Sequence, residues 1–304
     1  VHFLVPPDAF ARVYNAVQLT TPLALAASTN SPTFLGHRLW DETRVALFKQ
    51  SVDSRPVEAQ RWRAPARVSF GHGWVRSGAF ELFQEAVSLF PPLLPVLSDE
   101  DPAEVQAGGG IPNLGELRLH QGTVWRWNRA IFDPASGGHL RIEMRALPSG
   151  PTPVDMMAAA AFQVGLAHAL REEVERCIPG FPFEYAQWNF YRAAQSGLDA
   201  KVLWPSSRAP SPVERPVDEL ILEMLPRADE GLDQLGVDVA ERRRLLGVFR
   251  DRVESGVTPS RWQHRVLEQR KSRMHRQDAL REMLEEYLAH ADRRLPIHEW
   301  RDHP

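Results

Sequence analysis

The chain has 304 residues, of which 43% are hydrophobic and 25% charged, and its formal net charge is −3, as in an average soluble globular protein. This charge argues against a nucleic-acid or anionic-membrane binder, because such proteins carry a large basic excess. The one cysteine, Cys177, excludes an internal disulfide framework. With no apolar run of about 20 residues and no signal-peptide pattern, we expect a cytoplasmic protein.

The first half of the sequence mixes short strands with helices. Residues 1–5 (VHFLV) alternate as a strand does, and apolar residues recur at helical spacing over 9–19, 20–28, 41–52 and 77–90. Residues 98–113 then form a long loop, which is either functional or disordered. The runs ELRLH, TVWRWNRAIF and HLRIEMR follow at short intervals, and they predict a three-stranded antiparallel meander.

The second half is predicted to be mainly helical. Helical patterns cover 154–177, 217–235, 238–255 and 260–294. The fold class is therefore α+β. We assign residues 1–152 to a sheet-containing catalytic part and residues 153–304 to a helical part packed on the same catalytic domain.

The sharpest chemical pattern lies in HLRIEMR, where Arg141, Glu143 and Arg145 alternate with apolar residues. In a strand, successive side chains point to opposite faces, so these three charged side chains share one face while the apolar ones enter the core. An exposed sheet face with one ion pair explains the same pattern. The row alone therefore leaves a functional and a structural interpretation open.

Neighbouring runs strengthen the functional interpretation. In ELRLH the side chains of Glu116, Arg118 and His120 are expected on one strand face, and in TVWRWNR those of Arg126 and Asn128. If these strands are adjacent, one sheet face gathers guanidiniums around few carboxylates. Such a surface suits a polyanion held together with a divalent metal, because arginine binds phosphate bidentately and carboxylates bind Mg²⁺.

Other signals favour ordinary structural roles. The basic run 270–276 lies on a predicted helix with many acidic residues and an apolar stripe, which favours a solvated amphipathic helix over a nucleic-acid surface. The glycine-rich runs FGHGW and AGGGIP match neither a phosphate-binding loop nor a dinucleotide fingerprint, and no GxSxG is present. Cys177 has no paired histidine nearby in the sequence, so we interpret it as inert.

Several segments together resemble one family. The run HLRIEMRALPSGPTPVDMMAAAAFQVGL resembles the hallmark segment of the glutamate–cysteine ligase family of carboxylate-amine ligases. The run LAASTNSPTFLGHRLWDETRVALFKQ resembles another of its segments, and GTVWRWNR, AAQSGLDAKV, SGVTPSRWQ and LPIHEW follow in consistent order. Together these segments cover nearly all of the chain.

The resemblance implies a glutamine-synthetase-like fold, in which a curved antiparallel sheet holds ATP and divalent metal, Mg²⁺ or Mn²⁺. It also implies a reaction in which ATP phosphorylates the γ-carboxylate of glutamate, or a similar acid, and the amino group of cysteine or another amine attacks the acyl phosphate. The partners implied are thus small-molecule substrates, with neither nucleic acid nor membrane. Such chemistry needs metals and arginines to stabilise the phosphate charge.

The resemblance also assigns roles to individual residues. Glu143 matches the family's metal-binding glutamate and Arg145 an arginine that reaches the ATP phosphates, so these two are the catalytic candidates. His2 resembles a polar residue near the metals, or it is an ordinary exposed strand histidine.

Further residues are binding candidates by the same resemblance. Arg129 and Arg141 are assigned to the nucleotide, together with Arg145. Arg44, Asn30 and Arg126 are assigned to the substrate. Each of them could instead hold loops together through hydrogen bonds.

One departure from the family pattern affects the metal prediction. The family's early strand carries a GxExE-type motif with further metal carboxylates, and this motif does not occur in the chain. We therefore expect an N-terminal segment of the same protein, missing here, to complete the sheet. Two alternatives remain: a ligase with the same chemistry on another acid or amine, and a non-catalytic binding or scaffold protein without a full metal set.

Overall fold

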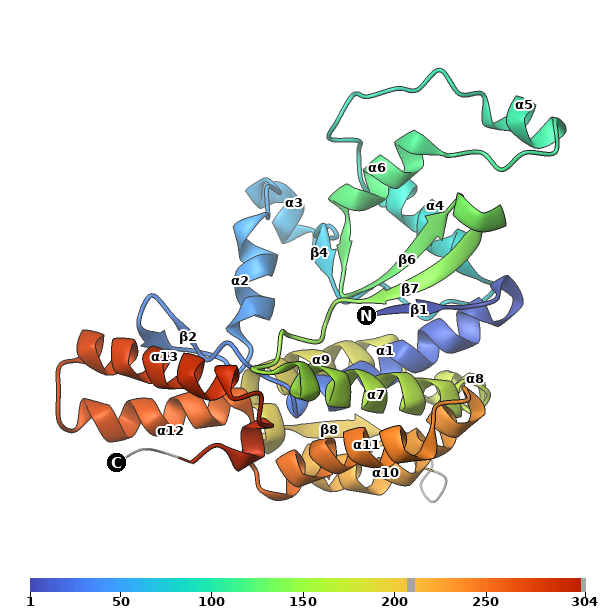
Figure 1. The fold of residues 1–304 in the computed structure, drawn as a ribbon. Coiled ribbons are helices and arrows are strands. Elements are labelled where there is room, and N and C mark those ends of the chain that lie inside the picture. Colours follow the sequence, from blue (N-terminus) through green and yellow to red (C-terminus); the bar gives the residue numbers. More distant parts are fainter. Residues whose placement is uncertain (207–210, 302–304) are drawn as a thin grey trace. The chain divides into compact units, whose positions relative to one another are not determined.

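The computed structural model describes residues 1–206 and 211–301 (Figure 1). The chain is α+β, as predicted, with small sheets and a mainly helical second half. It divides into two compact units, the first formed by Val1–Asn15 and Phe48–Arg145, and the second by Ala16–Leu47 and Ala146–Pro304. No helix among the described residues combines the length and apolar character that a membrane crossing needs.

A three-stranded antiparallel sheet organises the first unit. Its strands lie side by side in the order β1 (His2–Leu4), β7 (His139–Met144) and β6 (Asn128–Asp133) (Figure 1). The predicted alternation is confirmed around β7, where Ile142 and Met144 are buried while Arg141, Glu143 and Arg145 are only half-buried. The charged row therefore lies opposite the core-facing side of this sheet.

The other elements of the first unit are short. They are the two-stranded parallel pair β4 (Val68–Ser69) and β5 (Trp125–Arg126), the helices α3 (Val57–Arg61), α4 (Ala79–Leu89), α5 (Pro102–Ala107) and α6 (Gly115–Thr123), and the 3-10 turns η1 (Pro7–Ala9) and η2 (Ala135–Gly137). Two helices run from one unit into the other: α1 (Phe10–Ala26) and α2 (Thr43–Ser51).

The predicted meander is wrong in its first strand. ELRLH lies in the helix α6, so Glu116, Arg118 and His120 do not share a sheet face, and the third strand of the sheet is β1. A run of five residues is too short for its alternation to exclude a helix. Packing against α4 decides the outcome, and the His120 ring reaches the carbonyl of Ala86 at 3.0 Å.

Helix α1 continues through a position where the sequence predicts a new helix. Pro22 lies inside α1 instead of in the first turn of a second helix. An internal proline costs about 3 kcal/mol. Leu23 and Leu25, which follow it, are fully buried, and burial of such side chains stabilises by about 1.5–3 kcal/mol each. Burial therefore outweighs the lost hydrogen bond.

The second unit is built mainly of helices. These are α7 (Pro153–Leu170), α8 (Val174–Cys177), α9 (Phe183–Ser196), α10 (Val217–Gln234), α11 (Val239–Glu254), α12 (Pro259–Lys271) and α13 (Arg276–Asp292), with the 3-10 turns η3 (Ile178–Gly180), η4 (Gly197–Asp199) and η5 (Ile297–Glu299). Two antiparallel pairs accompany them: β2 (Thr33–Phe34) with β3 (His37–Arg38), and β8 (Lys201–Trp204) with β9 (Val213–Pro216).

Two of the predicted helices are each divided in the structure. The helix predicted over 260–294 breaks between Lys271 and Arg276, and the one over 154–177 breaks after Leu170. The first break lets α12 and α13 lie side by side around a shared apolar core (Figure 1). Helical spacing continues through both breaks, so only the packing of the two halves reveals them.

The crossing of α7 and α10 is unusually close. A Cβ atom at Gly165 would lie 2.3 Å from the carbonyl oxygen of Ala228, and one at Gly231 would lie 1.9 Å from the carbonyl oxygen of Gly165. Because these are backbone atoms, a side chain at either position would force the helices apart. Both glycines are required by the close approach of the two helices.

We predict that Gly165→Ala lowers the free energy of unfolding by about 2–3 kcal/mol, because the added methyl overpacks this crossing. Gly247→Ala in α11 is the matched control, since a Cβ there meets nothing within 4 Å. This control should be neutral or stabilising by up to about 1 kcal/mol, as alanine favours helix. Urea unfolding of both variants tests the prediction, and equal stabilities would contradict it.

Candidate active site

Three adjacent strands align part of the predicted charged row in the first unit. In the antiparallel register, Glu143 of β7 lies opposite His2 of β1 on one side and opposite Arg129 of β6 on the other. Arg145 follows β7, and its backbone N–H donates to the carbonyl of Trp127 at 2.8 Å. The structure therefore brings four of the predicted residues together, and we call His2, Arg129, Glu143 and Arg145 the Glu143 cluster.

The two carboxylate oxygens of Glu143 have different surroundings. Oε2 accepts hydrogen bonds from Nε of Arg129 at 2.9 Å and from Nε of Arg145 at 2.7 Å. Oε1 lies 3.7 Å from Nε2 of His2. The Glu143 side chain is 20% exposed, so a ligand can approach the carboxylate.

The electrostatics of the cluster keep Glu143 ionised. Burial raises the pKa of Glu143, but the guanidiniums of Arg129 and Arg145 lower it by more than burial raises it. The pKa therefore lies below its ordinary value. Burial lowers the pKa of His2, and this outweighs the opposing effect of Glu143. With a neutral histidine, two guanidiniums and one carboxylate, the cluster carries a net charge of +1 and attracts anions.

An aromatic side chain supports Arg145. The guanidinium carbon lies 3.9 Å from the ring centroid of Trp125, a cation–π distance. Phe48 packs edge-on against Trp125 with ring centroids 4.5 Å apart. We did not anticipate this support from the sequence, although the run WRW just before Arg129 was the available signal.

Two predicted arginines lie outside the Glu143 cluster. Arg141 donates from Nη2 to Oδ2 of Asp133 at 2.8 Å. Arg126 is buried and bonds to Ser69 and Glu85. The Arg126 guanidinium is buried and already has these two partners, so its geometry favours a structural role.

The predicted residues of the second unit meet at a buried carboxylate that the sequence analysis missed. Glu42 is fully buried and accepts hydrogen bonds from the Asn30 backbone N–H and from Nε of Arg44, both at 2.8 Å. Arg44 also donates from Nη2 to the carbonyl of Ala146 at 2.7 Å. The signal available in the sequence was the position of Glu42 in DETR, two residues before Arg44.

The Asn30 side chain joins three segments of the second unit. Its Nδ2 donates to the carbonyl of Ser149 at 2.7 Å and lies 2.9 Å from the hydroxyl of Tyr287. Its Oδ1 accepts from Nε2 of Gln263 at 2.8 Å. Because both ends of the amide have protein partners, the geometry favours a positioning role for Asn30 over direct substrate binding.

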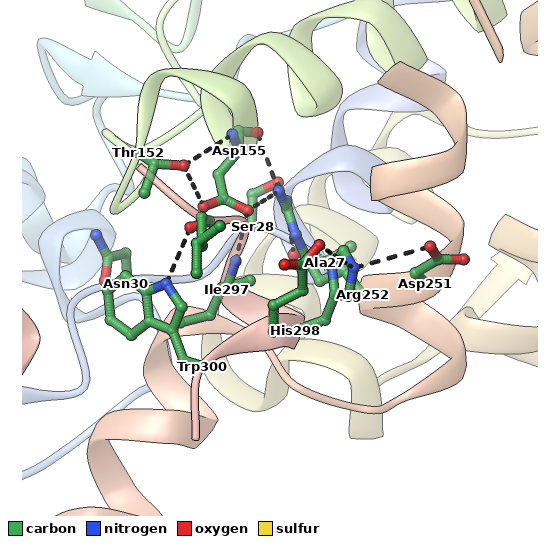
Figure 2. Close-up of polar contacts among 12 residues, drawn as sticks. Ala27, Ser28, Asn30, Thr152, Asp155, Asp251, Arg252, Ile297, His298 and Trp300 are labelled. Carbon is green, nitrogen blue, oxygen red and sulfur yellow. Dashed lines mark hydrogen bonds and ion pairs between the residues drawn. The ribbon is translucent and has the colours of Figure 1, made fainter. Parts of the chain in front are cut away.

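A buried ion pair near this segment is shown in Figure 2. Asp155 and Arg252 are each 1% exposed, and Oδ1 of Asp155 lies 2.8 Å from Nη2 of Arg252. The same Oδ1 accepts from the backbone N–H of Ile297 at 3.2 Å. Arg252 also donates from Nη1 to the carbonyl of Ala27 at 3.3 Å. The pair thus ties α7, α11, η5 and the end of α1 together.

The described residues do not by themselves form a complete metal site. Among residues 1–206 and 211–301, no three His, Cys, Asp or Glu side chains lie close enough together to hold a metal ion. Glu143 and His2 are thus two candidate ligands without a third. Of these, Oε1 of Glu143 is the better donor for Mg²⁺, which prefers oxygen and keeps several water or phosphate ligands.

The comparison with protein families identifies the chain. It matches Glutamate-cysteine ligase family 2 (GCS2) over residues 2–289, and because this match spans almost all of the sequence, the chain belongs to that family. The family predicted from the sequence is therefore confirmed, and with it a ligase of the glutamate–cysteine ligase-like type. A search of curated proteins finds no match.

We predict that Arg252→Met lowers the free energy of unfolding of the second unit by about 3–5 kcal/mol, because it leaves the carboxylate of Asp155 buried without its charge partner. Arg250→Met on the same helix is exposed and serves as control, with an expected change within about 0.5 kcal/mol. Denaturant unfolding measures both changes. Similar stabilities of the two variants would show that the buried pair contributes little.

We also predict a pH-dependent effect of Glu143→Gln. Since the pKa of Glu143 is lowered in the folded state, its ion pairs stabilise the fold above the unfolded pKa of about 4.3, and this contribution is lost as the pH falls through the folded value. At neutral pH the variant should be less stable than the wild type by about 1–2 kcal/mol. The difference should shrink below about pH 4.

Unfolding measured from neutral to acidic pH tests this dependence. Glu104→Gln is the matched control, because Glu104 is exposed in the same unit. Its effect on stability should be within about 0.5 kcal/mol throughout. A stability difference for Glu143→Gln that does not change with pH would contradict the assignment of the effect to the Glu143 charge.

Proposed function

We propose that the chain acts as an ATP- and Mg²⁺-dependent carboxylate-amine ligase that forms a γ-glutamyl amide through an acyl phosphate. The observation that supports this most directly is the Glu143 cluster, in which one carboxylate oxygen is held by two guanidiniums and the other is not. Family membership supports the reaction class. The strands β1, β7 and β6 would then belong to a glutamine-synthetase-like curved sheet.

In this proposal Glu143 is a ligand of the Mg²⁺ that accompanies ATP. Mg²⁺ in nucleotide sites is commonly held by one or two carboxylates together with phosphate oxygens and water. Oε1 of Glu143 fits one such position, with His2 beside it at 3.7 Å from its Nε2. When bound, the metal would neutralise phosphate charge during phosphoryl transfer.

Arg129 and Arg145 are proposed to bind the phosphates. Both hold Oε2 of Glu143 through Nε, which aligns each guanidinium relative to the carboxylate. Arginine binds phosphate oxygens well because its donors form a planar fork. The ring of Trp125 limits the motion of Arg145, so its positive charge is in position before the transferred group develops negative charge.

The acid substrate is proposed to be glutamate, and its amine partner cysteine or another amine. In the second unit, Arg44 is proposed to bind a carboxylate of the substrate. Its Nε donates to Glu42 and its Nη2 donates to the carbonyl of Ala146. Asn30 is proposed to position this segment. The same chemistry with a different acid or amine is the nearest rival, because no described pocket identifies a thiol substrate.

A non-catalytic binding protein is the second candidate. It is favoured by one observation: the described residues include no group of three metal-ligating side chains, while the Glu143 cluster carries excess positive charge. Such a protein would bind a nucleotide or another polyanion without turning it over. An N-terminal segment that supplies further carboxylates would favour the ligase.

ADP release tests the proposal and separates the candidates. The protein is assayed with ATP and Mg²⁺, with and without glutamate, and with a panel of amines that includes cysteine. Release that requires glutamate and rises with one amine supports the ligase and names the acceptor. ATP binding without ADP release for any pair supports the binding protein, and release that requires another acid supports the rival ligase.

For the active protein we predict that Glu143→Gln lowers kcat by about 10²-fold or more, because the metal loses an anionic ligand. Glu104→Gln, at an exposed position of the same unit, should leave kcat within about twofold. ADP release at saturating ATP and Mg²⁺ measures both variants. An unchanged kcat for Glu143→Gln would remove this residue from the mechanism.

A further inference from the structure

A pocket of the first unit lies outside the Glu143 cluster. It has a volume of about 500 Å³ and is lined by residues of α4, of α6 and of the segment 90–97 that follows α4. Both helices are marked in Figure 1. Most of the side chains that line the pocket are apolar, and no lysine or arginine is among the described residues of its lining. The proposed reaction does not use this pocket.

Many of the apolar side chains of this pocket are exposed to solvent. Leu93, Leu94 and Val96 are half or more exposed, and so is Val87 of α4. Leu97 is 86% exposed. Apolar side chains that are exposed singly are normal, but a contiguous group of them marks an interaction site. The pocket therefore fits an apolar group that another molecule supplies.

Two carboxylates border the pocket without a basic partner. Glu116 belongs to the lining, and its Oε1 accepts a hydrogen bond from Oγ of Ser98 at 2.7 Å. Asp99 follows Ser98 and is exposed. Neither carboxylate forms an ion pair with a described residue, and Arg118 of α6 donates to Oδ1 of Asn113 instead. The pocket thus favours a partner that brings positive charge beside its apolar group.

The first unit also exposes an aromatic side chain beside unpaired positive charge. Trp62, at the end of α3, is 88% exposed. Arg61 and Arg63 flank it, are exposed, and form no ion pair with a described residue. The other exposed aromatic side chains of the described residues have acidic or uncharged neighbours in the sequence; they are Phe34, Phe80 and Trp188. Among these side chains, Trp62 is therefore the one that complements the pocket in both polarity and charge.

Arg67 connects Trp62 with the pocket. Its Nη2 donates to the carbonyl of Pro91 at 2.5 Å, and its Nη1 donates to Oγ1 of Thr123 at 3.1 Å. Thr123 lines the pocket, and Pro91 lies within the segment that forms one of its walls. Trp62 precedes Arg67 by only five residues, so their Cα atoms are at most about 18 Å apart. The exposed tryptophan and the pocket are therefore close to each other on the first unit.

We propose that a second copy of this chain occupies the pocket, in a two-fold dimer in which each copy inserts Trp62 into the pocket of the other. Because the two features lie close together, two-fold symmetry joins both contacts in one interface. Tryptophan buries about 150–250 Å² of surface and is enriched among the residues that dominate interface energies. Arg61 and Arg63 then face the carboxylates that border the pocket of the second copy.

The proposal is independent of the ligase function, because none of its residues belongs to the Glu143 cluster or to the Glu42 and Asn30 contacts. Sedimentation equilibrium over a range of protein concentrations tests it, since the weight-average mass gives the dissociation constant of the dimer. We expect Trp62→Ser to raise this constant by about tenfold or more. Trp188→Ser removes an exposed tryptophan of the second unit. It is the matched control and should leave the constant within about twofold.

Charge reversal tests which surfaces meet. Arg61→Glu combined with Arg63→Glu should raise the dissociation constant by about tenfold or more, because it places like charges at the pocket. Asp99→Arg should weaken the wild-type dimer but strengthen the dimer of this doubly substituted chain. Arg243→Glu combined with Arg250→Glu reverses two exposed arginines of α11 and is the matched control.

Three results would overturn the proposal. The protein could remain monomeric at every concentration, which would leave the pocket to a different molecule. Trp62→Ser could leave the dimer unchanged, or Asp99→Arg could shift the dissociation constant in the same direction in both backgrounds. Because Trp62 is exposed, its substitution is expected to leave the fold intact. The melting temperature of Trp62→Ser, compared with that of Trp188→Ser, verifies this before the masses are interpreted.

Discussion

The shared carboxylate of Glu143 is the interaction on which the first unit's site depends. Arg129 and Arg145 both donate to the same oxygen, and they reach it only because Glu143 lies opposite Arg129 across β6 and β7. A one-residue slip of β7 in this register would turn Glu143 to the other face of the sheet. The core-facing Ile142 and Met144 prevent such a slip, since it would expose them. Apolar packing on one face thus sets the chemistry on the other.

The second unit uses buried carboxylates in a similar way. Glu42 holds the segment around Asn30 and Arg44, and Asp155 holds Arg252 together with the backbone of Ile297. A buried carboxylate is costly unless it is paired and hydrogen-bonded. Each of them is therefore a point where segments distant in the sequence must meet, and the geometry of Asn30 and Arg44 follows from these contacts.

The charge of the Glu143 cluster also bears on the proposed reaction. Two guanidiniums around one carboxylate attract the phosphates of a nucleotide more readily than they attract a free metal ion. A divalent cation that arrives with ATP brings phosphate ligands of its own. The proposed function is compatible with this order of events, whereas a resident metal site would need carboxylates beyond Glu143.

Local pattern and motif order could be predicted from the sequence, because they depend on residues close together in the chain. The alternation in β7 placed Arg141, Glu143 and Arg145 on one face. Helical spacing indicated that the second half is mainly helical, and the order of motifs indicated the family. Tertiary structure decided the rest. Alternation in ELRLH could not reveal the contact with α4 that makes it a helix. Arg126 and Arg129 lie only three residues apart in the sequence, yet they have different partners. Arg126 is buried and pairs with Glu85, whereas the strand register places Arg129 beside Glu143. The partner of a charged side chain depends on which distant segment packs against it. The residues next to it in the sequence do not indicate which segment that is.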